Sequence, residues 1–549
     1  MKRFWITIWL IGGALLLGCA LLVPAHFRAV DSEVVARAGQ ERLGPSTPTL
    51  VEEGITLLSM EKLGPARMLL RAAQSEGMAR SDWLAAAVAR FTRDNPSLVA
   101  LGGAAPPLDK VEIASGTASE PRSIIDLLTR RVAREKALEL VRQSRRPGVQ
   151  QILRNRTLTN TVHFPAASSA SGQALDTAII TAALLYQGEY LTPSFRDLFE
   201  LLSFRANRGE NSGALELVYL DLLSLGRRLD WVSLTELMKR IDDLGTLRDL
   251  AQTLRAHGEA TANIYSALLL SGNASGLAHY LTRYPETGFN DLAFALRNGR
   301  SAVELLLQQQ QRVYYGGFRS KVVAYDPFYS FFYGLTPTAV ASRGGALSLK
   351  YAFLLLATLC IARAVGSITS ALGHRFGMRF AADCVLALAM TFVASVAVEP
   401  FLGLPNQLNE FPIRFQIPNL AGATGLKLQQ LTRPYMNQLS IISLIIFFFI
   451  QAAIYIWCLT KLAEIRRQPI GARMKLKLIE NEDLLFDAGL YVGFVGSVLS
   501  LILMSIGVGK ISMMAYASTS FGIIFVSALK IFHVRPMRRK LILESEAQP

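Results

Sequence analysis

The chain has 549 residues, a formal net charge of +15 and a hydrophobic content of 51%, and its mean hydropathy is +0.31. Uncharged apolar runs of about 20 residues, long enough to cross a bilayer, occur at the N-terminus and repeatedly after residue 345. These features exclude a cytosolic enzyme, a disordered chain and a small disulfide-linked scaffold. We expect a mainly α-helical, multi-pass membrane protein with one large soluble domain.

The first apolar run covers residues 4–25 and follows a basic N-terminal stretch at residues 1–3. By the positive-inside rule, this stretch lies in the cytoplasm. We expect the run to be a retained membrane anchor. Two alternatives stay open: Leu16-Leu17-Gly18-Cys19 resembles a bacterial lipobox, in which Cys19 would be lipidated, and ordinary signal cleavage would remove the run.

Cysteine and arginine usage indicate the compartment. All four cysteines lie inside or beside apolar runs and none lies between residues 28 and 345, so the soluble domain is expected to fold without disulfides. Arginine outnumbers lysine 43 to 14, which is typical of a GC-rich bacterial genome. We therefore interpret the membrane as a bacterial inner membrane.

Residues 28–93 have a helical period and are predicted to form helical hairpins. Thr47-Pro48 and Gly64-Pro65 are predicted to open two of these helices. The alternatives are an ordinary hairpin and a tetratricopeptide-like pair, which is suggested by the spacing of Gly54, Leu57, Ala66, Leu70 and Ala73.

Residues 94–121 are rich in Gly and Pro and are predicted to form a linker. Residues 122–312 are predicted to form an array of short helices, an α-solenoid or an irregular array without strands, and solenoids mostly bind other proteins. A second break, rich in Ala and Ser, is predicted at residues 165–172. Beyond it, caps and breakers separate the predicted helices 174–187, 193–206, 213–226, 230–243, 246–257, 259–271, 274–284 and 289–311, the last as two helices.

The stretch 122–156 carries ten basic residues against three acidic ones. It could attract anionic headgroups or an acidic partner. The alternative is a solvated helix face. Nucleic acid is not an expected partner of a domain outside the cytoplasm.

Residues 313–345 are predicted to lie along the membrane–water boundary, where aromatic side chains concentrate. The alternative is a plug of aromatic core between the domain and its membrane base. The residues expected at the interface are Phe328, Tyr329, Phe331, Phe332 and Tyr333.

Residues 346–532 are predicted to form a five-span membrane domain, with an outer loop at 403–436, a cytoplasmic loop at 461–486 and a basic cytoplasmic tail at 533–549. With six spans in total, both termini lie in the cytoplasm and the large domain is periplasmic. Fifteen Lys and Arg residues then flank the spans on the cytoplasmic side, against four in the short outer loops. The predicted spans are 4–25, 346–366, 382–402, 438–460, 487–508 and 511–532.

No motif names a reaction. The six histidines are scattered, and neither a HExxH or Cys-pair metal site nor a GxSxG elbow is present. We therefore expect no catalytic residue, cofactor or metal. Polar groups in the spans are the remaining signal: Asp383 is spaced to pair with Arg379, Glu399 and Lys530 lie at span ends, and Gln451 and Ser518–Ser520 lie deep.

Small residues recur every four positions in the last two spans, which lets helices approach closely. Gly493, Gly496, Ser497, Ser518, Thr519 and Gly522 resemble the last two pore helices of the MotA/TolQ/ExbB proton-channel proteins, over about 45 residues. The resemblance implies an ion-conducting or transport subunit. Packing alone is the default reading, and the expected packing residues are Gly489, Gly493, Gly496, Ser497, Ser500, Ser518 and Gly522.

The sequence thus predicts a non-enzymatic inner-membrane scaffold or assembly protein that presents a periplasmic helical domain to a protein partner. Its expected partners are the lipid bilayer and a periplasmic or membrane protein, and a homo-oligomer is an open alternative.

Overall fold

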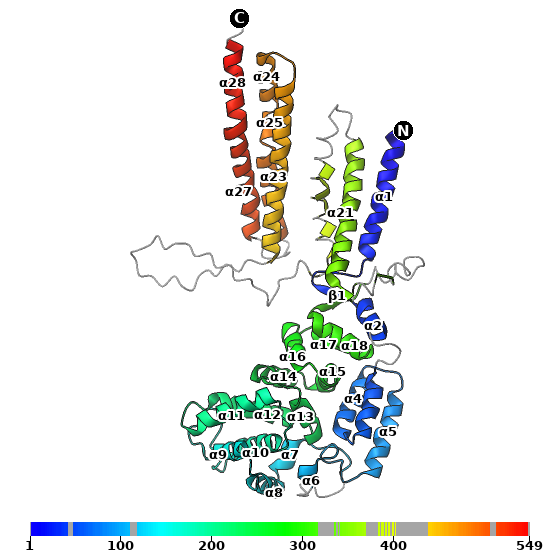
Figure 1. The fold of residues 1–549 in the computed structure, drawn as a ribbon, viewed down its shortest axis with the longest axis vertical. Coiled ribbons are helices and arrows are strands. Elements are labelled where there is room, and N and C mark those ends of the chain that lie inside the picture. The colour runs from blue at the N-terminus through cyan, green and yellow to red at the C-terminus, as the bar shows by residue number, and fades with distance from the viewer. Residues whose placement is uncertain are drawn as a thin grey trace, which may run out of the picture. The chain divides into compact units, whose positions relative to one another are not determined.

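The structure is a computed structural model (Figure 1). It is mainly helical with almost no strand, which confirms the predicted mainly α class. It describes residues 2–41, 48–109, 118–316, 334–335, 339, 341–368, 383–384, 386–388, 390–391, 394–395, 398–399, 401, 438–505 and 512–546.

Three described helices are long and apolar enough to cross a membrane: Phe4–Leu22, Arg343–Val365 and Ser518–Glu546. The first two match the predicted spans 4–25 and 346–366 closely, and the third overlaps the predicted span 511–532 but continues to Glu546. The third predicted span is described only in short pieces between residues 383 and 401. The fourth lies within a long helix, α23 (Gln438–Arg467), and the fifth contains a shorter apolar helix at Ala488–Val498. These three spans stay predictions.

The chain divides into two compact units. We call Val30–Tyr315 the inserted unit, because the other unit is formed by the chain on both sides of it. That second unit, Met1–Ala29 with Gly316–Pro549, contains the candidate membrane helices, and we call it the apolar unit.

In the apolar unit, α1 (Lys2–Leu22) packs against α21 (Arg343–Ile368). Gly13 in α1 lies against Ala357 and Ile361, where an added Cβ would come within 2.9 Å of Ile361 Cγ1. Beyond the end of α1, the Ala25 carbonyl accepts a hydrogen bond from Lys350. Residue numbers fall along α21 as they rise along α1, so the two helices are antiparallel.

A second group of helices in the apolar unit begins with α23 and continues through α24 (Ala472–Asn481), α25 (Asp483–Phe486), α26 (Ala488–Ser505) and α27 (Ser512–Leu529). A π-helical turn, η4 (Lys530–Val534), joins α27 to α28 (Arg535–Glu546), so one helical rod runs from Ser512 to Glu546. The predicted loop at 461–486 and the predicted tail are therefore largely helical.

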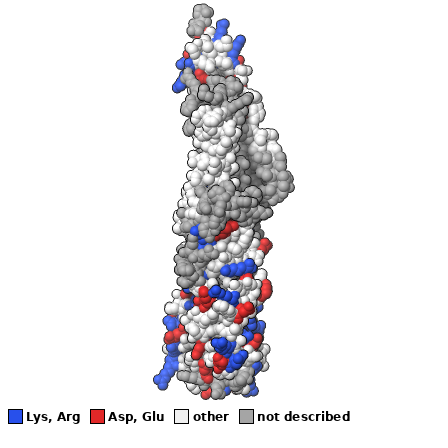
Figure 2. Space-filling view, turned by 90° about the vertical axis from the view of Figure 1, so that its right-hand side faces the viewer, with Lys and Arg blue, Asp and Glu red and all other residues white. Residues whose placement is uncertain are grey.

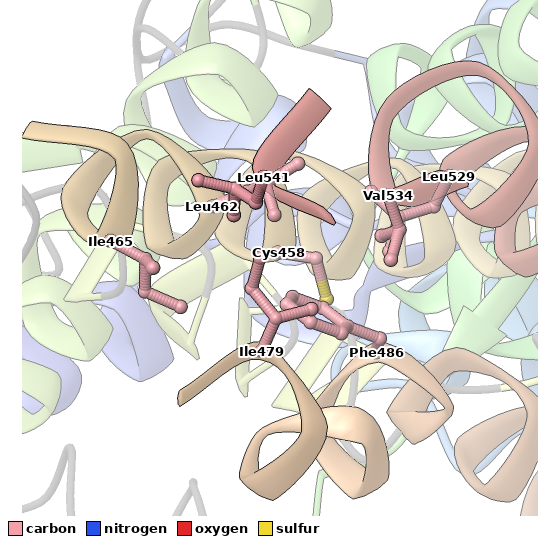
Figure 3. Close-up of a cluster of buried hydrophobic side chains, with 8 residues drawn as sticks. All are labelled: Cys458, Leu462, Ile465, Ile479, Phe486, Leu529, Val534 and Leu541. Atoms are coloured by element: carbon pink, nitrogen blue, oxygen red, sulfur yellow. The ribbon is translucent and has the colours of Figure 1, made fainter. Parts of the chain in front are cut away.

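An apolar cluster packs α23, α24, α25 and the end of α27 against η4 and α28 (Figure 3). Apolar side chains recur on one face of these helices, and each helix buries that apolar face against its neighbours. Its buried members are Cys458, Leu462, Ile465, Ile479, Phe486, Leu529, Val534 and Leu541.

The inserted unit begins and ends on a two-stranded sheet, β1 (Ala29–Asp31) paired with β2 (Arg312–Tyr314). The sequence analysis predicted no strand at either position, and the predicted helical array at 122–312 meets β2 only at its last residue. Two strands of three residues are too short to leave an alternating pattern in the sequence. The chain therefore enters and leaves the inserted unit at neighbouring positions.

The first helices of the inserted unit are α2 (Ser32–Glu41), α3 (Leu50–Ser59), α4 (Leu63–Ser75) and α5 (Ser81–Asp94). The cap of α3 is Thr49, not the predicted Thr47. Thr49 and Glu52 form a capping box, in which each side chain accepts a hydrogen bond from the other's backbone N–H. α4 begins at Leu63, one residue before the predicted Gly64-Pro65 start.

The middle of the inserted unit contains α6 (Pro106–Asp109), α7 (Ile124–Thr129), α8 (Arg131–Arg142) and α9 (Pro147–Arg154). Beyond a 3₁₀ turn, η2 (Asn155–Thr157), helices close to those predicted follow along the chain (Figure 1). They are α10 (Gln173–Gln187), α11 (Pro193–Asn207), α12 (Gly213–Gly226), α13 (Trp231–Met238), α14 (Leu244–Ala256), α15 (Thr261–Ser271) after η3 (Gly258–Ala260), α16 (Ala274–Arg283), α17 (Gly288–Arg297) and α18 (Arg300–Gln309).

The largest departure from prediction is α13, which ends at Met238 rather than residue 243. Asp243 instead caps α14 by accepting hydrogen bonds from the backbone N–H and the hydroxyl of Thr246. On the surface of the inserted unit, Lys and Arg are intermixed with Asp and Glu (Figure 2). The fold thus provides a mixed-charge helical unit and an apolar unit, and each contains buried polar groups.

Candidate functional site

The most concentrated group of buried ionisable side chains in the described apolar unit is formed by His26, Lys350 and Glu399. Their exposed fractions are 3%, 1% and 5%. Lys350 Nζ donates to Glu399 Oε1 at 2.8 Å, to the Ala25 carbonyl at 2.8 Å and to His26 Nδ1 at 2.9 Å. An ammonium group has three N–H donors, so all three are used.

Both carboxylate oxygens of Glu399 accept hydrogen bonds. Its Oε2 accepts from the Phe27 backbone N–H at 2.8 Å, and its Oε1 also accepts from the Tyr351 hydroxyl at 3.2 Å. Arg343 donates to the carbonyls of His26 and Phe27. The cluster therefore joins the segment after α1, the start of α21 and the chain at residue 399, and we call it the Lys350–Glu399 cluster.

The sequence placed Glu399 only at a span end and did not single out Lys350 or His26. Lys350 is 49 positions from Glu399 and more than 300 positions from His26 in the sequence, so local spacing does not predict that these side chains meet. Asp383 likewise pairs with Arg363 of α21 at 2.8 Å, whereas the predicted partner, Arg379, lies outside the described residues. Buried charges in an apolar unit need a charged partner, but the sequence does not say which one.

A second polar site lies between α23, α26 and α27. Gln451 is 1% exposed, and its Nε2 donates to the Gly489 carbonyl at 2.9 Å. A Cβ added at Gly489 would lie 2.9 Å from Gln451 Oε1, and one at Gly493 or Gly522 would lie 3.4 Å from Nε2. The three glycines thus form a notch that admits the Gln451 amide, and we call this arrangement the glycine notch.

The small residues also bring α26 and α27 together directly. A Cβ at Gly493 would meet the Ser518 carbonyl at 2.8 Å, one at Gly496 would meet Ser518 Oγ at 2.5 Å, and one at Gly522 would meet the Gly489 carbonyl at 2.7 Å. Ser497 and Thr519 share a hydrogen bond between their hydroxyls. Ser500 lies within α26, but its side chain is outside the described part of the chain.

Two polar atoms at this interface, Gln451 Oε1 and Ser518 Oγ, are buried and have no hydrogen-bond partner among the described residues. Buried polar atoms without partners cost free energy. This is the one chemical feature of the interface that close packing alone does not account for.

The inserted unit also buries carboxylates. Asp230 caps α13 by accepting from the backbone N–H of Ser233 at 2.8 Å and from its hydroxyl at 2.9 Å. It occupies a slot beside Gly64 and Gly102, where an added Cβ would lie 2.2 and 2.0 Å from carboxylate oxygens. Burial raises the pKa of the Asp230 carboxyl to about 6.

Glu216 in α12 organises the loop before α10. Its carboxylate accepts hydrogen bonds from three consecutive backbone N–H groups, at residues 162–164, and from the Ser212 hydroxyl. Burial raises the pKa of Glu216, but these hydrogen bonds outweigh burial and hold it below its usual range. The pattern is a structural anchor, because every donor comes from the protein itself.

The basic stretch at 122–156 is partly neutralised within the inserted unit. Arg134 and Arg156 pair with Asp176, Arg146 pairs with Glu189, and Arg131 pairs with Glu135. Asp176 and Glu189 lie outside residues 122–156, so the count of charges within that stretch did not include them. The stretch is thus less cationic than its composition indicates.

The remaining predicted site residues are placed as follows. Cys19 lies in α1, half-buried and with a free thiol. The five aromatic residues from Phe328 to Tyr333 lie outside the described residues. Among the described residues, no group of three or more His, Cys, Asp or Glu side chains could hold a metal ion. Comparison with known protein families, curated proteins and solved structures finds no match for this chain.

Proposed function

We propose that this chain is a non-enzymatic scaffold or assembly protein of the bacterial inner membrane. In this proposal six helices cross the membrane, both termini are cytoplasmic, and the inserted unit lies in the periplasm, where its helical pairs hold a protein partner.

The proposed threading is supported by the antiparallel pairing of α1 with α21. If both cross the membrane, residues between them emerge on one side, and the inserted unit indeed enters and leaves through adjacent strands. The distribution of Lys and Arg favours the periplasm as that side. A retained α1 is favoured by its packing on α21 and by the Lys350–Glu399 cluster, which uses residues just after α1.

The observation that carries the proposed scaffold role is the set of large apolar side chains left exposed on the inserted unit. Exposed apolar side chains on a stable, folded surface mark sites for partners. In helices α3, α5 and α11 these are Ile55, Trp83, Leu198, Leu201 and Phe204, with exposed fractions between 39% and 64%.

Photo-crosslinking in whole cells tests this role. A photoreactive residue replaces Trp83 or Leu201 in the tagged full-length chain, and Ser168, an exposed polar position, serves as the control. We expect a protein adduct, with another protein or with a second copy, at Trp83 or Leu201 and none at Ser168. Recovery of lipid adducts alone would contradict the scaffold role.

A second candidate, an ion-conducting or transport subunit, is favoured by the two unpartnered atoms at the glycine notch. Gln451 Oε1 and Ser518 Oγ could accept or relay hydrogen bonds from water between α23, α26 and α27. Proton flux through liposomes containing the full-length chain separates the two candidates. The scaffold proposal expects no flux above that of empty liposomes, and a flux abolished by Ser518→Ala or Thr519→Ala would favour the channel.

A further inference from the structure

α11 has one buried and one exposed face. Thr192 caps the helix and Pro193 occupies its first turn, while Phe195 and Phe199 are buried against its neighbours. On the opposite face, Leu198, Leu201 and Phe204 are 39%, 45% and 49% exposed. These three residues follow one another at helical spacing, and we call them the α11 row.

Charged side chains flank the row with opposite signs at its two ends. Asp197 is exposed at the N-terminal end, and Arg205 and Arg208 are exposed at the C-terminal end. Arg205 Nε also lies 3.9 Å from the exposed Glu210 carboxylate, at the outer limit of an ion pair. The Arg208 guanidinium lies over the Phe204 ring, 5.2 Å from its centroid. A matching surface must therefore be apolar in the middle, basic at one end and acidic at the other.

We infer that α11 packs antiparallel against α11 of a second copy of this chain. With a two-fold axis at Leu201, each exposed position meets another exposed position of the second copy. Leu201 then faces Leu201, Leu198 faces Phe204, and Asp197 faces Arg205. The apolar residues pair with apolar residues and the acid pairs with a base, as a self-complementary two-fold interface requires.

The charges also weigh against the other occupants. Asp197 and Glu210 balance Arg205 and Arg208 beside the row, so an anionic lipid surface would gain no net electrostatic attraction there. An unrelated amphipathic helix would need this same order of apolar and charged side chains, which a second copy supplies by symmetry.

One pair of helices buries less surface than a stable interface of about 1,600 Å², so this contact is weak between free molecules. The pairing therefore rests on the proposed membrane anchoring, since tethering two copies to one membrane raises their effective concentration. The α11 pairing names one partner of the proposed scaffold.

Cysteine crosslinking of the full-length chain in membranes tests the register in which the two α11 helices are proposed to pair. Leu201→Cys places a thiol on the axis, and Val132→Cys, on α8 and 68% exposed, is the control, with the wild-type chain as background for the native cysteines. We expect a disulfide-linked dimer with Leu201→Cys and none with Val132→Cys. Differently tagged Asp197→Cys and Arg205→Cys chains should form a mixed dimer more readily than either forms a dimer with itself.

Charge exchange provides an independent measurement. Asp197→Arg and Arg205→Asp should each reduce the Leu201→Cys dimer several-fold, and the double exchange should restore it, because the opposite charges then face each other again. Since these side chains are exposed, folding is retained in all three variants.

Several results would overturn the pairing: no dimer, equal dimer from Leu201→Cys and Val132→Cys, no rescue by the double exchange, or crosslinking of position 201 only to a different protein. The last result leaves the scaffold role standing. Failure of the scaffold role would instead appear as lipid adducts alone in the photo-crosslinking experiment.

Discussion

Lys350 Nζ lies 2.8 Å from Glu399 Oε1, and the two residues are 1% and 5% exposed. Each group also bonds the segment that follows α1, through the Ala25 carbonyl and the Phe27 N–H. The pair therefore connects three parts of the chain that are far apart in sequence. Its free-energy contribution depends on both charges being present, because either one alone would be buried without a counter-charge.

Lys350→Met should destabilise the apolar unit strongly, by about 3–5 kcal/mol, because it leaves the Glu399 carboxylate buried and unpaired. The double variant Lys350→Met/Glu399→Gln should be more stable than the single one, since it buries no charge. Thermal aggregation of the full-length chain in detergent measures both.

The matched control is Arg131→Met, which breaks the exposed Arg131–Glu135 pair. Exposed pairs contribute about 0–1 kcal/mol, so its aggregation temperature should stay close to that of the wild type. A double variant less stable than Lys350→Met would show that the two side chains do not act as a pair.

Gly493→Leu should lower the amount of folded protein in detergent, because a side chain at this position meets the Ser518 backbone and the Gln451 amide. Separating α26 from α27 loses the packing contacts that hold helices together inside lipid. Val495→Leu, at a position of α26 that is 64% exposed, is the control and should be tolerated. Equal yields of the two variants would show that the glycine face does not pack as described.

Gln451→Leu tests the glycine notch itself. It removes the hydrogen bond to the Gly489 carbonyl and should cost about 1 kcal/mol, as interhelical hydrogen bonds in membranes do. A Leu side chain branches where the planar amide fits, so Gln451→Leu changes the shape as well as the hydrogen bond. Gln451→Glu keeps the planar shape but lacks the NH2 donor, and it therefore tests the loss of this donor without the change of shape. If Gln451→Leu proves as stable as the wild type in the aggregation assay, the notch does not stabilise the three helices.

The sequence predicted helices well because their signals are local. Apolar spacing and caps such as Thr192-Pro193 lie within a few residues of the helices they define, and α10 to α18 begin and end near the predicted positions. The two strands could not be found in this way, since three residues provide too little pattern and their pairing joins chain ends about 280 residues apart.

The candidate sites depend on long-range pairing, and local patterns identify only one residue of each hydrogen-bonded pair as a polar group in an apolar run. Glu399, Asp383 and Gln451 stood out as polar residues in or near apolar runs. Their partners Lys350, Arg363 and Gly489 come from other helices. Local spacing does not select Lys350 or Arg363 as a partner, and it marks Gly489 only as a packing residue. The small residues of the last two spans pointed to close packing, but not to the amide that fills the notch.

Asp230→Asn should change how the stability of α13 depends on pH. Burial raises the folded-state pKa of Asp230 to about 6, from an ordinary value of 3.8. The stability that its protonated form contributes is therefore fully present below pH 3.8 and is lost as the pH rises through about 6, by an amount on the order of 3 kcal/mol. Asn caps a helix about as well as Asp and does not titrate.

Hydrogen exchange of the α13 backbone in the full-length chain measures this difference. Protection of the wild type, corrected for the intrinsic exchange rate, should fall between pH 4 and 6, and protection of Asp230→Asn should change less over that interval. A protection profile that is the same in both proteins would show that Asp230 does not titrate in this range.

The central claim, that the chain crosses the membrane and presents the inserted unit on the periplasmic side, is tested most directly by thiol labelling in cells. Cysteines replace Ser168, exposed in the inserted unit, and Met474, 55% exposed on α24, and an impermeant reagent is added after the outer membrane is opened, with the wild-type chain as background. We predict labelling of Ser168→Cys in intact cells and labelling of Met474→Cys only after lysis. Labelling of Met474→Cys in intact cells, or protection of Ser168→Cys, would contradict the claim.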